Sequence, residues 1–335
     1  HASPIAISSP PKADGSIPEF VLPAEPLSFS EGDQLRSWLS RTPPQIPPKW
    51  LYDQRGSELY EHITRLPEYY PTRTERGILT EHAAAIADLT QAKTVIELGA
   101  GSPEKSSILL RELGMRNSGH EFIPVDISTT YLEHIESSMA KTLPHVTVRP
   151  IQADFADRMP FTQGEPARLV LFLGGTLGNL DRLERAEFLA RVCAAIEPGD
   201  FFLLGVDLIK SRDRLIAAYY DRSGVTEKFI RNIVNVARKR WGATVFDEHF
   251  DYHASWVDEE SRVEMSLVAN QPTVMTIPSL DTTLSFGVGD RVLVETSHKF
   301  TRESITQEVL GSSLSVARAF SDVKEDFLVM LCTKE

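Results

Sequence analysis

The chain has 335 residues, of which 41% are hydrophobic, and a formal net charge of -12. Its length suffices for one large domain or two modest domains with sizeable cores. The negative charge would repel phosphate backbones and anionic bilayers, so it disfavours nucleic acids and membranes as main partners and favours small-molecule chemistry.

The two cysteines, Cys193 and Cys332, are too few for a disulfide framework. They favour free thiols in a reducing cytosol, so we expect a cytoplasmic protein. No run of about 18 apolar residues predicts a membrane span, and no signal peptide is expected. The Pro- and Ser-rich residues 1–20 are interpreted as a flexible tail.

Helices are the first elements predicted after this tail. From Glu31 the pattern EGDQLRSWLSRTP is amphipathic and stops at Pro43 and Pro44. A second helical stretch follows, with apolar residues from Leu59 to Leu66 on one face. The next helix is expected to begin at Thr72 or Thr74, after Pro71.

A tyrosine pair, Tyr69 and Tyr70, lies on a loop between Pro67 and Pro71. Prolines on both sides hold such a loop stiffly. The local pattern alone favours half-buried packing residues with solvated hydroxyls over a functional role.

Residues 94–105, TVIELGAGSPEK, are typical of a nucleotide-binding turn. Residues 94–98 predict a strand, and Gly99 and Gly101 let the backbone turn sharply and approach a ligand. Glu104 occupies the third glycine position of the dinucleotide pattern G-x-G-x-x-G, which disfavours a pyrophosphate. S-adenosylmethionine (SAM) contains no phosphate, so the turn suits it.

A strand, helix, strand unit is predicted around this turn. Ser102 is expected to cap the helix, with Pro103 in its first turn. The second strand, residues 121–126, ends in Asp126. A carboxylate at that place in an open α/β sheet can hold ribose hydroxyls, although the same residue could cap the helix from Ser128.

A third segment, VTVRPIQADF, ends in Asp154 and Phe155. The acid can accept a hydrogen bond from the exocyclic amine of adenine, and the ring can stack on the base. Because three successive strand ends carry ligand-type residues, the sequence predicts a SAM site at this edge of a sheet.

The run LVLFL, residues 169–173, is typical of a strand buried on both faces of a parallel sheet. It leads into a glycine-rich loop with Asn179, which could bind the carboxylate and amine of an amino acid or merely cap the next helix. A helix over 181–196 and a strand over 201–207 follow. This alternation predicts a doubly wound parallel α/β sheet.

After Asp207 the alternation ends. Helices are predicted over 213–219 and 226–241. The segments 246–260, 262–277 and 290–300 then alternate apolar and polar residues as antiparallel strands do. Such an insertion, joined to the N-terminal helices, predicts a second α+β domain that binds the substrate over the open end of the sheet. The expected division is 21–73 and 210–298 for the substrate domain, 74–209 for the SAM-binding domain, and 299–335 for C-terminal strands that complete the latter.

Glu295 and Ser297 are two residues apart on one predicted strand and so point to the same face. The carboxylate can accept from one imidazole N–H while the hydroxyl meets the other ring nitrogen. From the pattern alone, a solvent-facing pair on an edge strand is the more common explanation.

The segment YDQRGSELYEHITRLPEYYPTRTE resembles the SAM-dependent L-histidine Nα-methyltransferases of ergothioneine biosynthesis. The similarity continues through ELGAGSPEK, VDIS, ADF, FLGGTLGNL and VETSHKF, so it covers nearly all of the chain after Pro43. Two departures concern the loops near the cofactor: Pro103 stands where a Ser or Thr is expected, and GGT replaces the frequent GST. Neither removes a side chain that is assigned to binding.

The resemblance implies trimethylation of the α-amino group of histidine to hercynine, with SAM as methyl donor and no metal. It also implies a small-molecule substrate only, and we expect a monomer. Tyr52 and Tyr69 would be catalytic, orienting the amine or passing its proton to water. Histidine would be bound by Tyr69, Asn179, Tyr219, Met265, Glu295, Thr296 and Ser297, although core packing explains Met265 equally well. SAM would be bound by Gly99, Lys105, Asp126, Asp154 and Phe155.

Three other functions are compatible with parts of the sequence. An N-methyltransferase of the same fold could act on another amine such as tryptophan, but an indole has one donor and no ring acceptor to match Glu295 with Ser297. An NAD-dependent oxidoreductase is disfavoured by the broken glycine pattern. A SAM-binding protein without catalysis is disfavoured because every matched pocket position is filled by a suitable residue.

Overall fold

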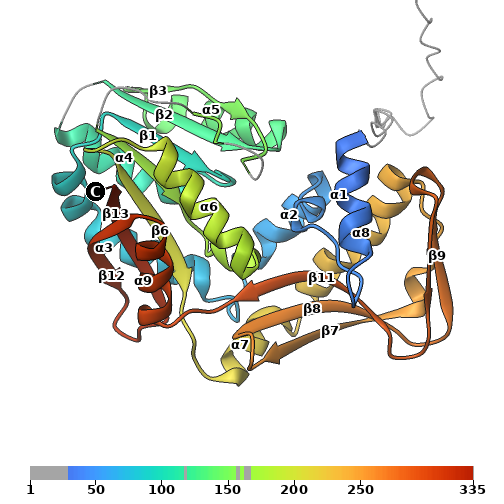
Figure 1. Ribbon diagram of the computed structural model, residues 1–335. Helices are drawn as coiled ribbons and strands as arrows, with labels where there is room; N and C mark the ends of the chain where they lie inside the picture. Colours follow the sequence, from blue (N-terminus) through green and yellow to red (C-terminus); the bar gives the residue numbers. More distant parts are fainter. Residues whose placement is uncertain (1–28, 117–118, 156–158, 162–166, 335) are drawn as a thin grey trace, which may run out of the picture.

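A computed structural model describes residues 29–116, 119–155, 159–161 and 167–334. The predicted tail, residues 1–20, lies outside this part of the chain. Figure 1 shows a larger body around a long sheet and a smaller body around α1, α8, β7 and β8. Across the described residues, no helix combines the length and apolarity needed to cross a bilayer.

The larger body contains a sheet with strand order β12-β13-β6-β5-β1-β2-β3, and β4 pairs with the end of β2. From β6 to β3 and β4 all neighbours run parallel, which confirms the predicted α/β sheet. The C-terminal β13 pairs antiparallel with β6 and with β12. The strands are β1 (Thr94–Leu98), β2 (His120–Asp126), β3 (Val146–Val148), β4 (Ile151–Gln152), β5 (Arg168–Phe172), β6 (Phe201–Asp207), β12 (Leu314–Ser321) and β13 (Phe327–Lys334).

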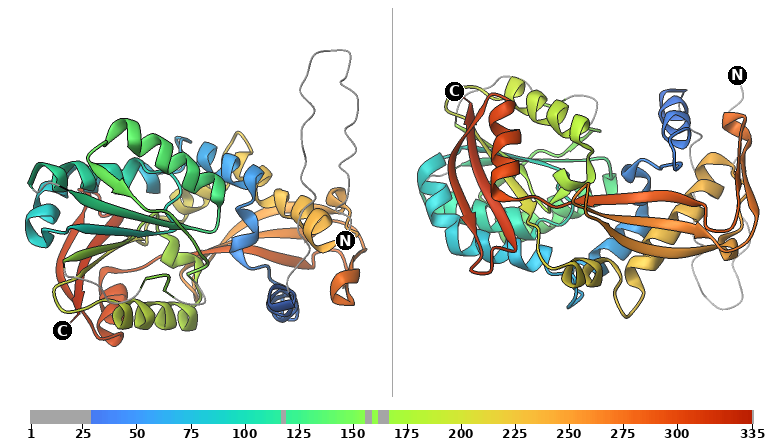
Figure 2. Two further views of the ribbon diagram at one scale, coloured as in Figure 1. Left: turned by 90° about the horizontal axis from the view of Figure 1, so that it is seen from above. Right: turned by 60° about the horizontal axis from the view of Figure 1, so that its bottom comes forward.

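Helices cover both faces of this sheet because neighbouring strand residues face opposite sides. Val95 belongs to the core under α3, α4 and α5, whereas Ile96 belongs to the core under α6 and α9. Figure 2 shows α5 and α6 on opposite sides of the strands. The helices are α3 (Pro71–Thr90), α4 (Glu104–Arg116), α5 (Thr129–Thr142), α6 (Arg182–Ala195) and α9 (Arg302–Gly311).

Two local predictions in this body are wrong. The helix after the glycine turn begins at Glu104, so Pro103 precedes its first turn and Ser102 is too early to cap it. The segment VTVRPIQADF is not one strand but β3 and β4, which are interrupted at Pro150. Proline cannot donate to a strand ladder, which explains the break.

The smaller body contains an antiparallel sheet of order β11-β8-β7 and a hairpin of β9 and β10. The alternating pattern predicts all of these strands except β10, which lies between the predicted segments. The segment RVEMSLVANQPTVMTI is divided between β8 and β9, which belong to different sheets. Its elements are α1 (Phe29–Leu39), α2 (Gln54–Ile63), α7 (Arg212–Tyr219), α8 (Val225–Trp241), β7 (Phe250–Val257), β8 (Arg262–Ala269), β9 (Thr273–Ile277), β10 (Thr282–Phe286), β11 (Arg291–His298), and the short 3₁₀ turns η1 (Pro48–Leu51), η3 (Asp247–His249) and η4 (Pro278–Leu280).

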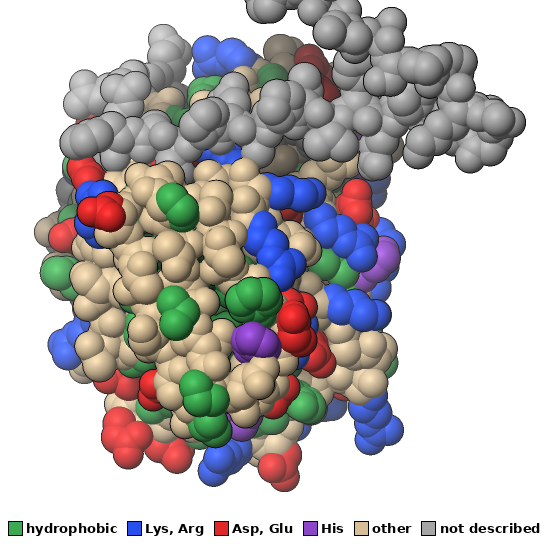
Figure 3. All heavy atoms as spheres, turned by 90° about the vertical axis from the view of Figure 1, so that its right-hand side faces the viewer, with side chains coloured by type: hydrophobic (Ala, Val, Ile, Leu, Met, Phe, Trp, Pro, Cys, Tyr) green, Lys and Arg blue, Asp and Glu red, His purple; other side chains and the backbone are tan. Residues whose placement is uncertain are grey.

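One hydrophobic core joins the N-terminal helices to the insertion. It draws its buried side chains from residues 35–70 and 215–294, and Trp50 and Trp241 meet edge to face within it at 5.7 Å. On the outer end of this body, which Figure 3 faces, hydrophobic side chains are scattered among polar and charged ones. The division into two domains with the expected boundaries stays a prediction.

Candidate active site

A solvent-connected pocket of about 570 Å³ lies where the two bodies meet. Its wall on the larger body comes from the loop after β5, which includes η2 (Thr176–Asn179), and from Asp207 at the end of β6. Its wall on the smaller body comes from α2, α7, α8 and β11. β1 and β5 are sheet neighbours whose connections leave in opposite directions, so this edge is where an open α/β sheet binds ligands.

Seven of the eight side chains predicted for catalysis or histidine binding line this pocket. They are Tyr52, Tyr69, Asn179, Tyr219, Met265, Glu295 and Ser297. Thr296 is the exception: it lines a second cavity together with Trp38 and Arg41, and its assignment to histidine stays a prediction. Strand alternation is the reason, because Thr296 pairs with Glu264 of β8 while Glu295 pairs with Met265 on the opposite face.

The loop that carries Asn179 is held tightly against β11. A side chain at Gly178 would come within 2.6 Å of the backbone oxygen of His298, so only glycine fits. The His298 ring nitrogen Nδ1 lies 2.9 Å from the Gly178 carbonyl oxygen. Asn179 does not cap the next helix, since Asp181 does so by accepting from the Glu184 amide at 2.9 Å.

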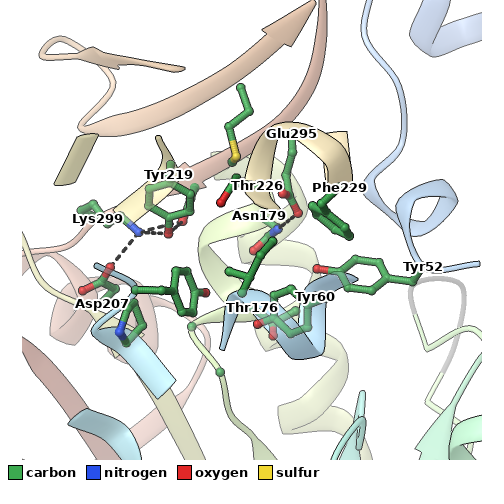
Figure 4. A pocket seen from close by; sticks show the side chains of 17 residues that line it. Tyr52, Tyr60, Thr176, Asn179, Asp207, Tyr219, Thr226, Phe229, Glu295 and Lys299 are labelled. Carbon is green, nitrogen blue, oxygen red and sulfur yellow. Dashed lines mark hydrogen bonds and ion pairs between the residues drawn. The ribbon is translucent and has the colours of Figure 1, made fainter. Parts of the chain in front are cut away.

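Asn179 and Glu295 point toward each other in the middle of the pocket (Figure 4). The Asn179 amide donates to Glu295 Oε1 at 2.7 Å. Glu295 is 7% exposed, and its burial raises the pKa of the carboxyl to about 8, although Lys299 and Asn179 partly offset the effect. At neutral pH this raised pKa favours the protonated form of the carboxyl.

Tyr219 and Ser297 share a buried lysine that the sequence-based prediction missed. Their hydroxyl oxygens lie 2.9 Å apart, and Lys299 Nζ donates to each of them at 2.7 Å. The same ammonium pairs with Asp207 at 2.7 Å. A hydrogen-bonded chain of four side chains thus crosses from β11 to the end of β6.

The pair Tyr69 and Tyr70 is fully buried, contrary to the half-buried packing that the local pattern favours. Tyr69 is 6% exposed and lines the pocket, and Tyr70 is 4% exposed behind it. The Tyr70 hydroxyl donates to Asp207 at 2.7 Å and is not solvated. Burial, followed by the Asp207 charge, raises the pKa of Tyr70, so this phenol stays neutral.

Aromatic rings form the other wall of the pocket. Tyr52 meets Tyr60 and Phe229 edge to face at 5.5 and 5.6 Å, and Tyr69 meets Tyr219 at 6.0 Å. Burial raises the pKa of Tyr52, Tyr60 and Tyr69, so their hydroxyls remain protonated at neutral pH. Tyr60 and Phe229 were missed by sequence reasoning, although the helical spacing of Tyr60 with Ile63 and of Phe229 with Ile233 marked both as inward-facing.

The predicted SAM residues gather at the glycine turn after β1. Gly99 and Gly101 have φ values of +68° and +47°, a region that side chains disfavour. The Gly101 amide donates to Asp126 Oδ2 at 3.2 Å, and the Ser128 amide donates to its Oδ1 at 2.9 Å. The ring of Phe155 lies 3.7 Å from the place of a Cβ on Gly99. Such a glycine cradle with a carboxylate and an aromatic ring fits a nucleoside.

Two ion pairs involve the remaining SAM residues. Lys105 Nζ lies 2.6 Å from Oε2 of Glu75, a buried carboxylate that also accepts from the Gly174 amide at 2.9 Å. Lys105 therefore lies beside the loop that lines the pocket. Asp154 pairs with Lys49 of the smaller body at 3.2 Å. Within the described residues, no group of three or more His, Cys, Asp or Glu side chains could hold a metal ion.

Comparisons with known proteins show the family of this chain. Residues 31–334 match the family described as histidine-specific, SAM-dependent methyltransferases. The chain is 38% identical over 298 residues to the histidine N-alpha-methyltransferase of Mycobacterium tuberculosis, covering 89% of this chain and 93% of that protein. It is 36% identical over 300 residues to the enzyme of the same name from Mycolicibacterium smegmatis, covering 90% and 94%. It is also 30% identical to ergothioneine biosynthesis protein 1 of Neurospora crassa, covering 78% of this chain and 30% of that longer protein.

Proposed function

The chain belongs to the family of histidine-specific, SAM-dependent methyltransferases, and from this premise we propose that it methylates the α-amino nitrogen of L-histidine. Three successive transfers would give hercynine, the first intermediate of ergothioneine biosynthesis. The observation that carries the proposal is the buried pair of Glu295 and Ser297, both of which line the pocket.

The ring of histidine is the part of the substrate that this pair recognises. An ionised Glu295 accepts from one ring N–H, and the Tyr219–Ser297 pair meets the other ring nitrogen. Asn179 has a second amide hydrogen and its carbonyl oxygen left for the amino-acid end of the substrate. Anchors at both ends of histidine fix where its α-nitrogen points.

Transfer of a methyl group to this nitrogen is an in-line displacement. SAM, when bound, supplies the methyl group on a positively charged sulfur, and Gly99, Lys105 and Asp126 are the residues that we propose to hold it. The protein contributes geometry, since holding reacting atoms at about 3 to 3.5 Å removes much of the entropic barrier. Tyr52 and Tyr69 would orient the amine and pass its proton to water.

The aromatic wall suits a substrate whose nitrogen loses one hydrogen-bond donor at each methyl transfer. Every transfer removes one N–H donor, so strong hydrogen bonds to the amine would stop the reaction early. The faces of Tyr52, Tyr60 and Phe229 attract a cation through their π electrons even after full methylation. We therefore assign the polar anchors to the ring and carboxylate and the aromatic rings to the nitrogen.

The test is to incubate the purified protein with SAM and each of the twenty amino acids, and to read mass gains of one, two or three methyl groups. We expect histidine alone to reach the trimethylated product. Methylation of tryptophan in preference to histidine would establish the alternative substrate, and no methylation of any amino acid would refute the proposal.

We also propose that the protein acts as a monomer in the cytoplasm. Both cysteines are buried free thiols, which suits a reducing compartment. Light scattering coupled to size-exclusion chromatography tests the monomer, and a mass of twice the chain mass would refute it.

A further inference from the structure

Lys299 is a buried cation in the wall of the pocket to which the sequence-based prediction assigned no role. Its side chain is 1% exposed, and all three of its N–H donors are used: by Asp207, Tyr219 and Ser297, each at 2.7 Å. Because no donor remains, the ammonium cannot bind a substrate directly. Any influence on the substrate must pass through the two hydroxyl groups that it contacts.

Lys299 is held in the charged form. Burial is the largest single influence and opposes the charge, but the charges of Asp207 and Tyr219 and the hydrogen bonds to them together outweigh burial, and the pKa of Lys299 is raised above its ordinary value. Asp207 does not depend on Lys299 alone, since Lys210 Nζ lies 2.6 Å away and the Tyr70 hydroxyl donates to it at 2.7 Å.

The hydrogen atoms of the two hydroxyls can be counted. Tyr219 and Ser297 each accept from Lys299 and are 2.9 Å apart, so one of their two hydroxyl hydrogens fills the bond between them. The other hydrogen is left over in either arrangement. When Tyr219 donates to Ser297, both lone pairs of the serine oxygen are occupied and its hydrogen is free for the pocket. The pair therefore offers a donor, and Lys299 takes away most of its capacity to accept.

We propose that Lys299 is a positioning residue for specificity: by donating to both hydroxyls it turns the Tyr219–Ser297 pair into a donor, so the pocket selects a ring with an unprotonated nitrogen. This inference rests on the proposed function. Glu295 as acceptor and the hydroxyl pair as donor together match a neutral imidazole, which has one N–H and one bare nitrogen. A ring with an N–H but no second nitrogen leaves a buried donor without a partner, which is costly.

The experiment compares histidine with its two pyrrole analogues, pyrrol-2-yl-alanine and pyrrol-3-yl-alanine. Each analogue keeps the five-membered ring and one N–H and replaces one ring nitrogen by C–H, so the two cover both placements. For the wild-type protein we expect kcat/KM for histidine to exceed that of the better analogue by at least about 100-fold. In Lys299→Met the hydroxyls can turn and accept, and we expect this ratio to fall by at least about 10-fold.

The control is Lys210→Met, which removes the other lysine on Asp207 without touching Tyr219 or Ser297. We expect it to keep the wild-type ratio. Equal losses for histidine and the analogue in Lys299→Met, or a wild-type protein that accepts both equally, would overturn the inference. If Lys299→Met does not fold, the double variant Asp207→Asn with Lys299→Met leaves no unpaired carboxylate and answers the same question. Absence of any methylation of histidine by the wild-type protein would instead refute the proposed function.

Discussion

Replacing Glu295 by Gln removes a charge from the ring end of the pocket while keeping the size of the side chain. Asn179 can still donate to the new amide oxygen, so the loop after β5 keeps its contact. The lost interaction is a hydrogen bond from the substrate N–H to a buried anion, and such bonds contribute about 1.5–3 kcal/mol. We expect KM for histidine to rise by about 10- to 100-fold, with little change in kcat, because the ring is bound equally before and during the transfer.

The same substitution changes the dependence of the rate on pH. A carboxyl with a raised pKa is protonated below that value, and the ionised form accepts a stronger hydrogen bond from the ring N–H than the neutral acid does; kcat/KM should therefore rise with pH as Glu295, with a pKa of about 8, loses its proton. The Gln variant cannot titrate and should lose this part of the profile, whereas any contribution from the amine of histidine remains. Initial rates of S-adenosylhomocysteine formation at saturating SAM across this pH range measure both effects.

A matched control uses the neighbouring strand. Glu264 is 3% exposed on β8, pairs with Arg262 and Arg291, and faces away from the pocket. We expect Glu264→Gln to leave KM for histidine unchanged. If Glu295→Gln left KM and the pH profile as they are, or if Glu264→Gln had the same effect, recognition of the ring by Glu295 would be refuted.

Three further substitutions test other parts of the site. Asp126→Ala should raise the Kd for S-adenosylhomocysteine by about 10- to 100-fold in calorimetry; an unchanged Kd would contradict its place at the ribose. Gly99→Ala puts a side chain at φ +68°, which costs about 1–2 kcal/mol, so thermal unfolding should shift to lower temperature; an unshifted transition would show that the turn relaxes freely. Tyr60→Leu should accumulate mono- and dimethylated histidine in mass spectra, whereas Tyr60→Phe should not; equal product patterns would count against cation–π support.

The large sheet could be predicted from the sequence because its signals are local. The apolar run 169–173 and the glycine turn at Gly99 each identify an element without knowledge of the rest of the chain. The position of β13 beside β6, in antiparallel orientation, could not be predicted in this way, because the pairing of residues 201–207 with residues 327–333 is decided by the whole fold. The interruption between β3 and β4 could have been predicted, because Pro150 cannot donate a hydrogen bond to a neighbouring strand.

The residues of the candidate site could be predicted only where they belong to a sequence motif. Thr296 was assigned to histidine together with its neighbours, although strand alternation already places it on the other face. Lys299 lies in the predicted strand segment 290–300 at the same parity as Glu295 and Ser297, so the pattern already placed it on the same face, yet it was given no role. Asp207 follows an apolar strand as an acid, like Asp126, yet its role depends on lysines that come together only in three dimensions.

The separation of the two hydrophobic cores has an evolutionary consequence. Side chains that contact the proposed substrate ring, on β11 and α7, are anchored in one core, while the glycine turn and Asp126 belong to the other body. Substitutions at distant, independently packed sites combine nearly additively. During evolution, substitutions at positions such as 295 and 297 can therefore change which amine is bound, without altering the affinity for the methyl donor.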